Sequence, residues 1–227
     1  MGPNEVESEA CVSDTANKWQ SVEHALAYLE RADTIPHRVE GEAALVEEIR
    51  GDAERVLDLG TGDGRLMALV LTKASQATGV AVDFSAAMLE RCRERFRGDA
   101  RVEILEHDLS APLPELGRFG TVVSSFAIHH LTHERKRALY CEVWQRLLPG
   151  GVFCNLEHVS SPTAALHEAF LSALAVRPED DDPSNQLLDV NTQLGWLREI
   201  GFEDVDCLWK WRELALIRGA SASRTGA

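Results

Sequence analysis

Residues 56–66 read Val-Leu-Asp-Leu-Gly-Thr-Gly-Asp-Gly-Arg-Leu, and this stretch decides the fold. Apolar residues lead into three alternating glycines, and a helix-forming run then continues to Lys73. The pattern predicts a strand, a tight turn and a helix. Glycine permits positive φ in such a turn and lets a ligand approach the backbone closely. We therefore interpret the turn, with Gly60, Thr61 and Gly62 at its centre, as a nucleotide-binding loop.

The spacing of the glycines distinguishes two classes of nucleotide site. The dinucleotide fingerprint Gly-x-Gly-x-x-Gly needs a third glycine where this chain has Arg65. A pyrophosphate cradle, and with it an NAD-dependent oxidoreductase, is therefore the weaker interpretation. Asp58 ends the predicted strand, where its carboxylate can accept hydrogen bonds from loop amides or meet a cationic part of the ligand.

The segment Asp58-Leu-Gly-Thr-Gly-Asp-Gly64 resembles the first motif of the class I S-adenosylmethionine-dependent methyltransferases. Later motifs agree with that family in order and spacing from Arg55 to Arg218. The resemblance implies an α/β, Rossmann-like fold with a seven-stranded, mostly parallel sheet and an antiparallel C-terminal hairpin, occupying residues 51–218. It also implies that the methyl donor, S-adenosyl-L-methionine, lies at the carboxyl ends of the first two strands.

Two further acidic residues follow predicted strands. Asp83 ends the second strand, where a carboxylate can accept hydrogen bonds from both ribose hydroxyls. Asp108 and Leu109 match the family motif for adenine: the carboxylate accepts from the exocyclic amino group and the leucine packs on the ring. Met88 either packs against the adenine face or belongs to the core.

Three more donor-site residues rest on the resemblance. Phe84 and Ser125 are assigned to the donor site with the motifs that they adjoin. Related enzymes often place a polar residue before the motif-carrying strand to meet the donor's carboxylate, and Arg38 occupies that place. Simple solvent exposure is the alternative for Arg38.

Histidines mark the carboxyl ends of the central strands. The fourth predicted strand, residues 121–127, is followed by His129 and His130, and the fifth ends near His158. A neutral imidazole can take a proton from an attacking hydroxyl. We expect His129 to be the base, with His130 and His158 as further candidates, and at most one of the adjacent pair to face the acceptor. Alternatively none is catalytic, because methyl transfer to an ionised carboxylate needs no base.

The residues around the fourth strand narrow the class of acceptor. Ser124-Ser-Phe-Ala127 stands where amino-methylating nucleic-acid enzymes of this fold have Asn/Asp-Pro-Pro-Tyr, and the Pro-Cys nucleophile of cytosine-C5 enzymes is missing. No acidic metal-ligand pair follows the strand. The sequence predicts a metal-free enzyme that methylates an oxygen, or less favourably a nitrogen, of a small-molecule metabolite. A protein of this fold that binds the donor without methylating anything, or uses it for other chemistry, is the alternative.

Composition limits partners and compartment. A net charge of −14 over 227 residues disfavours binding to nucleic acid. The sequence has no apolar run long enough to span a bilayer, and its acidic start does not resemble a secretory signal. The five cysteines are scattered singly, so we predict neither a disulfide nor a zinc site and expect a cytoplasmic protein. Whether it forms a homodimer is left open.

The two ends of the chain complete the predicted organisation. Residues 1–14 are expected to be a disordered tail, and residues 219–227 a flexible one. Two amphipathic helices within residues 15–50 are expected to form a cap whose ordering depends on ligand, with ordinary packing on the sheet as the alternative.

In the closing hairpin, Trp209 and Trp211 are expected to share a core-facing side with Val205 and Cys207.

Overall fold

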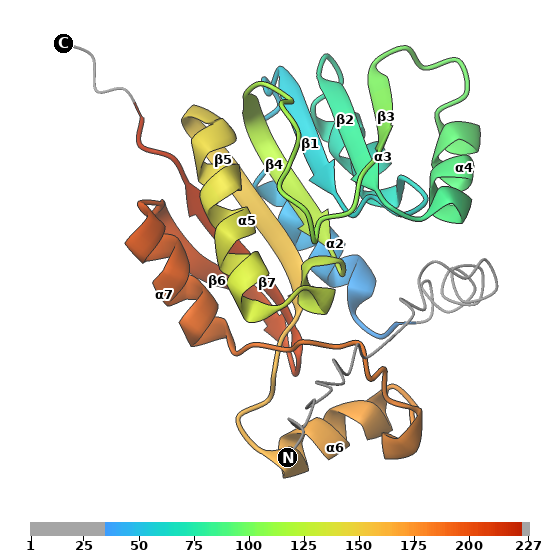
Figure 1. Cartoon of the computed structure of the whole chain (residues 1–227), viewed down its shortest axis with the longest axis vertical. Coiled ribbons are helices and arrows are strands. Elements are labelled where there is room, and N and C mark those ends of the chain that lie inside the picture. The colour runs from blue at the N-terminus through green and yellow to red at the C-terminus, as the bar shows by residue number, and fades with distance from the viewer. Residues whose placement is uncertain (1–34, 224–227) are drawn as a thin grey trace, which may run out of the picture.

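A computed structural model describes residues 35–223, in which seven strands form one sheet in the order β3-β2-β1-β4-β5-β7-β6 (Figure 1). The strands are β1 Arg55–Leu59, β2 Thr78–Asp83, β3 Val102–Glu106, β4 Phe119–Ser125, β5 Leu147–His158, β6 Glu203–Trp211 and β7 Leu214–Ala220. The helices are α2 Arg38–Glu47, α3 Arg65–Lys73, α4 Ala86–Arg95, η2 Ile128–His130, α5 His133–Arg146, α6 Ala164–Ala173, η3 Pro178–Asp180 and α7 Val190–Ile200.

The connectivity is that of a doubly wound sheet with a reversed end. Strands β1 to β5 pair in parallel, whereas β7 runs antiparallel between β5 and β6. The strand order reverses beside β1, and ligands of open α/β sheets bind at such a point, outside the carboxyl ends of the strands. The predicted seven-stranded fold with its antiparallel hairpin is confirmed.

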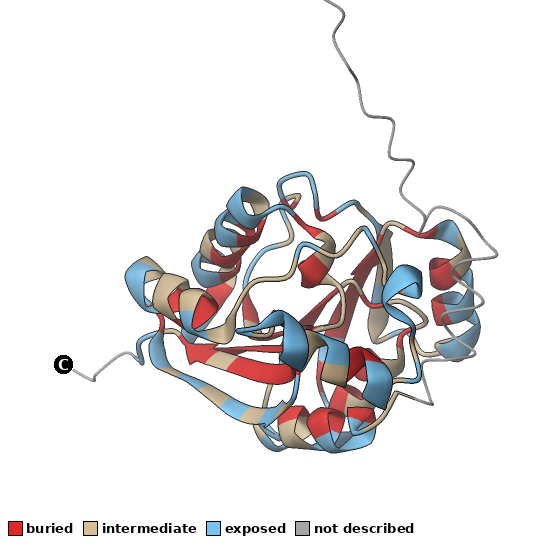
Figure 2. Cartoon of the chain, turned by 90° about the horizontal axis from the view of Figure 1, so that it is seen from below, coloured by how far each residue is buried: buried red, intermediate tan, exposed pale blue. Residues whose placement is uncertain are grey.

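Alternate residues of the strands enter two cores, one on each face of the sheet. Leu57, Val80 and Val122 belong to the core beneath α5 and α7, and their neighbours Val56 and Ala81 belong to the core beneath α2 and α3. Figure 2 shows the buried strands enclosed between these helical layers. Burial on both faces explains why β1, β2 and β4 are mostly apolar, whereas β3, at the edge of the sheet, carries the exposed Glu103.

Helix α2 packs closely on the sheet. Leu45 is fully buried, and a Cβ at Gly41 would lie 2.9 Å from Leu156 of β5, so only glycine permits this approach. This helix is the second of the two expected in the cap, and the first lies outside the described residues, as does the tail at residues 1–14. That residues 15–50 close over a ligand stays a prediction.

The hairpin departs from the expected pattern because β6 carries a bulge. Cys207 pairs with Ile217 but Trp209 pairs with Leu216, so Leu208 is the extra residue. Cys207 consequently packs on the α5 side of the sheet and Trp209 on the α2 side. The expectation that these side chains share one face is wrong, since a two-residue period does not reveal a bulge.

One capped helix and one strand boundary complete the description of the fold. Helix α6 is capped by Thr163, whose hydroxyl accepts from the amide of Leu166. Strand β7 continues to Ala220, so the predicted limit of the fold at Arg218 is wrong by two residues, and residues 219 and 220 belong to the strand rather than to a tail. Among residues 35–223 no helix is long and apolar enough to cross a membrane.

Candidate functional site

The turn after β1 is shaped by two glycines with positive φ. At Gly60 φ is 68°, and a Cβ would lie 2.1 Å from the Cβ of Ala127, so the turn touches the segment after β4. At Gly62 φ is 57°, and a Cβ would meet nothing within 4 Å. The first glycine therefore serves close packing, whereas the second leaves the backbone open to a ligand.

Asp58 supports the turn from within the protein. Thr61 Oγ1 donates to Asp58 Oδ2 over 2.6 Å, and the carboxyl group is completely buried. Burial raises the pKa of Asp58 to about 7, against the lowering effect of the Thr61 hydrogen bond. Its Oδ1 has no hydrogen-bond partner among the described residues. Asp58 thus stands behind Thr61 and does not line the cavity, unlike the position expected for a donor-binding residue.

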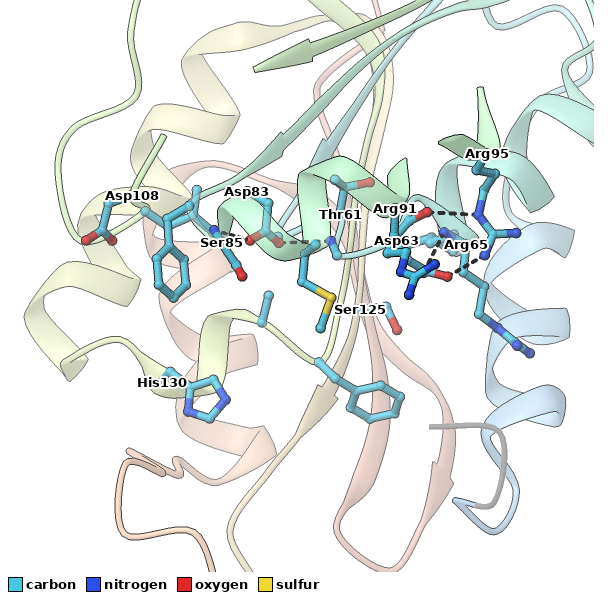
Figure 3. A pocket seen from close by; sticks show the side chains of 18 of the residues that line it. Thr61, Asp63, Arg65, Asp83, Ser85, Arg91, Arg95, Asp108, Ser125 and His130 are labelled. Atoms are coloured by element: carbon cyan, nitrogen blue, oxygen red, sulfur yellow. Dashed lines mark hydrogen bonds and ion pairs between the residues drawn. The ribbon is translucent and has the colours of Figure 1, made fainter. Parts of the chain in front are cut away.

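Asp83 links the two loops that follow β1 and β2. Its Oδ2 accepts from the amide of Gly62 over 2.9 Å, and its Oδ1 accepts from the amide of Ser85 over 2.8 Å (Figure 3). Burial raises the pKa of Asp83, and the amide bonds oppose that effect. Asp108 repeats the arrangement after β3, where its Oδ1 accepts from the amide of Ser110 over 2.8 Å. Each carboxylate is thus fixed by backbone amides.

A cavity of about 550 Å³ opens beside these groups, within the range of small-molecule sites. All the predicted donor-site residues except Asp58 line it: Arg38, Gly60, Thr61, Gly62, Asp83, Phe84, Met88, Asp108, Leu109 and Ser125. The open backbone at Gly62 and the carboxylates on the wall fit a nucleoside with hydroxyl and amino donors. The residues present therefore fit the adenosyl group of S-adenosyl-L-methionine.

Arginine and acidic side chains gather at one end of the cavity, and of these only Arg38 was predicted. Arg38 and Arg65 both pair with the buried Glu42, over 2.8 Å and 2.9 Å. Arg38 is only 8% exposed, which contradicts the alternative that it is a solvated side chain. The unpredicted Asp63, Arg91 and Arg95 also line the cavity, and Arg95 donates to Asp63. The four-residue spacing of Arg91 and Arg95 on α4 was the available signal.

The adjacent histidines after β4 occupy different environments. His130 lines the cavity, across from Asp83 in Figure 3, and its Nδ1 lies 3.0 Å from Ser184 Oγ. Burial lowers the pKa of His130 to about 3. His129 is buried, and its Nδ1 lies 2.6 Å from Oε1 of Glu157 on β5. The pair splits as expected, but His130, rather than the favoured His129, is on the cavity wall.

His158 belongs to a second histidine–carboxylate cluster. Its Nε2 lies 3.0 Å from Glu213 Oε2, in the turn between β6 and β7, and the other oxygen of Glu213 lies 3.0 Å from His167 Nδ1 of α6. Burial lowers the pKa of His158, partly offset by Glu213. The rings of His129 and His158 have centroids 5.6 Å apart, so the two clusters adjoin.

The carboxylate partners decide what the histidines can do. A carboxylate only accepts, so Glu157 fixes the proton of His129 on Nδ1 and leaves Nε2 as the basic nitrogen. Glu157 was not predicted, although an acidic residue near the end of a buried apolar strand was the signal available. Across residues 35–223, no group of histidine, cysteine and acidic side chains is arranged to hold a metal ion.

Comparisons with known proteins identify the family of this chain. A family model described as a methyltransferase domain matches residues 56–151. The carboxy-S-adenosyl-L-methionine synthase of Erwinia tasmaniensis is 35% identical over 149 residues, covering 60% of this chain and 59% of that protein. The demethylmenaquinone methyltransferase of Clavibacter sepedonicus is 32% identical over 168 residues, 67% of each chain.

A solved structure extends the likeness to the whole fold. An O-methyltransferase family protein from Burkholderia thailandensis superposes with a TM-score of 0.73 at 19% identity, covering 91% of this chain and 62% of that one. The chain spans about three fifths of the length of the first relative it matches. The glycine turn, the sheet order and the 32% identity to a demethylmenaquinone methyltransferase point to one family. This chain belongs to the class I S-adenosylmethionine-dependent methyltransferases.

Proposed function

We propose that this protein transfers a methyl group from S-adenosyl-L-methionine to an oxygen, or a nitrogen, of a small-molecule metabolite, with His129 as the general base. The observation that carries the proposal is the hydrogen bond of 2.6 Å between His129 and Glu157, next to a cavity suited to the donor. When bound, the donor supplies an activated methyl group on a sulfonium. The protein's remaining tasks are alignment, exclusion of water and removal of a proton.

The proton-accepting role falls to His129 rather than to its neighbour. Glu157 holds the His129 ring in the tautomer with a free Nε2 and stabilises the imidazolium that forms when a proton arrives. His130 has a pKa of about 3, so it stays uncharged at neutral pH but is a weak base. We assign His130 to shaping the wall between donor and acceptor, and His158 to the second cluster beside it.

Different residues of the donor site contact different parts of the donor in this proposal. Asp83 and Asp108 offer acceptor oxygens to the ribose and the adenine amino group, and Met88 and Leu109 supply apolar surface. Arg38 and Arg65 line the cavity, and we assign their guanidinium groups to the donor's carboxylate. Phe126, Ala127 and Leu131 line the cavity near His130, where apolar side chains would exclude water.

The class of acceptor follows from size and charge. A cavity of about 550 Å³ suits the donor and a compact acceptor. The net charge of −14 disfavours a polyanionic partner such as nucleic acid. Oxygen is favoured as the accepting atom because a hydroxyl gains most from a base that removes its proton.

The test is to incubate the protein with a metabolite extract and methyl-labelled S-adenosyl-L-methionine, and to identify labelled products by mass spectrometry. A labelled small molecule with an O-methyl or N-methyl group is the expected result. One relative is named a carboxy-S-adenosyl-L-methionine synthase, so the donor pool is examined as well. A donor that gains a carboxyl group while no acceptor is labelled would contradict the proposal.

A further inference from the structure

Lys136 is a buried lysine in the first turn of α5. It is 1% exposed, although lysine is almost never fully buried unless it is paired. Its Nζ donates to the carbonyl oxygen of His129 over 3.3 Å and to the carbonyl oxygen of Gln186. Neither carbonyl neutralises the ammonium, so burying Lys136 costs free energy of folding. A residue of that kind needs a reason beyond packing.

The contacts of Lys136 lie where a distant segment crosses the histidine pair. The amide of Gln186 donates to the carbonyl of His129 over 2.9 Å, and Ser184 Oγ lies 3.0 Å from His130 Nδ1. Lys136 bonds the carbonyls of both His129 and Gln186, so it joins the crossing segment to η2. His129 is therefore held at two points, its ring by Glu157 and its carbonyl by Lys136 and Gln186.

The positive charge of Lys136 also compensates the negative charge of Glu157. Burial lowers the pKa of Lys136 to about 8, and the negative charge of Glu157 opposes this lowering. Glu157 is 1% exposed, and a buried carboxylate needs a compensating cation. The ammonium and the carboxylate thus flank His129, one acting on its backbone and the other on its ring.

We infer that Lys136 is a positioning residue for methyl transfer: its ammonium fixes the peptide of His129 and balances Glu157, so that the His129 ring keeps one orientation and one tautomer. The inference rests on the proposed role of His129 as the base. It assigns a function to Lys136 that an uncharged side chain of similar shape could not supply.

Among the groups around His129 that have shifted pKa values, Lys136 is the one whose pKa, about 8, lies just above neutral pH. The others with shifted pKa values are His130 of η2, Tyr140 of α5, His158 of β5 and Glu213 of the β6–β7 turn. Burial lowers the pKa of both histidines and raises that of Tyr140, so all three side chains stay neutral at a pH just above 7. The pKa of Glu213 is lowered, so it stays charged.

The experiment compares Lys136→Met and Lys136→Arg with Lys73→Met, which removes an exposed lysine at the end of α3. The first readout is the ¹⁵N chemical shift of the His129 ring, which separates the two tautomers and needs no acceptor. The second is formation of S-adenosylhomocysteine in the metabolite extract, set against the affinity for S-adenosylhomocysteine from calorimetry.

We expect wild type, Lys73→Met and Lys136→Arg to show the Nδ1–H tautomer at pH 7, and Lys136→Met to show a mixture. Turnover in Lys136→Met should fall about 10- to 100-fold, as for a misplaced catalytic group, with affinity changed less than about twofold. In wild type the single tautomer should be lost as the pH rises through about 8.

A Lys136→Met variant with the wild-type tautomer and turnover would overturn the inference. If that variant does not fold, a wild-type tautomer that is unchanged from pH 7 to pH 9 overturns it equally. Failure of the proposed function is seen separately, because a His129→Ala variant at full turnover contradicts the base but leaves the tautomer measurement to decide the role of Lys136.

Discussion

The donor half of the site and its histidine half are held together by different kinds of contact. In the donor half, Asp83 and Asp108 accept hydrogen bonds from backbone amides of the turns at the same edge of the sheet. Gly60 and Gly62 give those turns their course. The backbone of the turns after β1, β2 and β3 therefore determines where these carboxylates lie.

In the histidine half, side chains from distant parts of the chain meet one another. Glu157 reaches His129 from β5, and Glu213 reaches His158 from the last hairpin. Lys136 reaches across to residue 186. These side chains are ionisable and buried, so their geometry depends on charge as well as on fold. Changes in the donor half should therefore alter affinity, whereas changes in the histidine half should alter rate and pH dependence.

His129→Ala is expected to separate the effect on the methyl-transfer rate from the effect on donor affinity most clearly. General-base catalysis contributes about 10²- to 10⁴-fold, so the maximal methyl-transfer rate should fall by that factor while the affinity for S-adenosylhomocysteine stays nearly constant. Single-turnover kinetics and calorimetry measure the two quantities.

The matched control for this prediction is His133→Ala, which removes an exposed histidine at the start of α5 and should keep the wild-type rate. A His129→Ala variant at full rate would show that no base is needed at this position. An equal loss of rate and donor affinity would instead move His129 to the donor site.

Gly60→Ala should cause the largest loss of stability in the donor half. The added Cβ would meet Ala127 at 2.1 Å, and the residue would also be held at φ 68°. Together these effects should cost about 2–4 kcal/mol in the free energy of unfolding, measured with denaturant. Gly98→Ala is the control, because Gly98 has φ 82° but nothing within 4 Å of its Cβ position.

Gly98→Ala should cost only the backbone term, about 1–2 kcal/mol. If the two variants lose the same stability, the contact between the turn and Ala127 contributes nothing and the donor half is less tightly packed than we describe.

Asp83→Ala should weaken donor binding by tenfold or more. Hydrogen bonds to a charged group contribute about 1.5–3 kcal/mol each, and this carboxylate also fixes the amides of Gly62 and Ser85. Calorimetry with S-adenosylhomocysteine measures the loss, with the exposed Asp52→Ala as control. Unchanged affinity in Asp83→Ala would remove this residue from the donor site.

The same contrast explains how much the sequence could predict. The donor half is encoded locally, because its glycines and acids lie within or just after predictable strands, and of the residues predicted for it only Asp58 does not line the cavity. The position of Asp58 has a physical cause that the sequence does not show: the period of a strand places Asp58 near its end, but does not reveal that Thr61 donates to its carboxylate.

The histidine half could be predicted only in part. The positions of His129, His130 and His158 follow from the strands, but their partners lie 28 residues away for His129 and 55 residues away for His158. Which of two adjacent histidines turns inward depends on Glu157 and Ser184, and no local pattern contains that information. The bulge at Leu208 was hidden for the same reason, since it is a property of two strands together.

The smallest expected effect tests whether charge holds the outer part of the histidine half. Burial opposes protonation of His167, but Glu213 and Asp181 outweigh it and raise its pKa. The folded state then binds this proton more tightly than the unfolded state. The resulting stability is fully present below the ordinary histidine pKa of about 6.5 and is lost as the pH rises through the raised value.

His167→Gln should therefore destabilise the protein more at pH 5.5 than at pH 8. Because the His167 side chain is 31% exposed, solvent screening limits the difference to under about 1 kcal/mol. Denaturant unfolding at the two pH values measures it, with His133→Gln as the control, since His133 lies against a backbone carbonyl rather than a carboxylate. A loss that is the same at both pH values would mean that α6 is held to the β6–β7 turn by packing alone, and that buried charge organises only the inner His129–Glu157 pair.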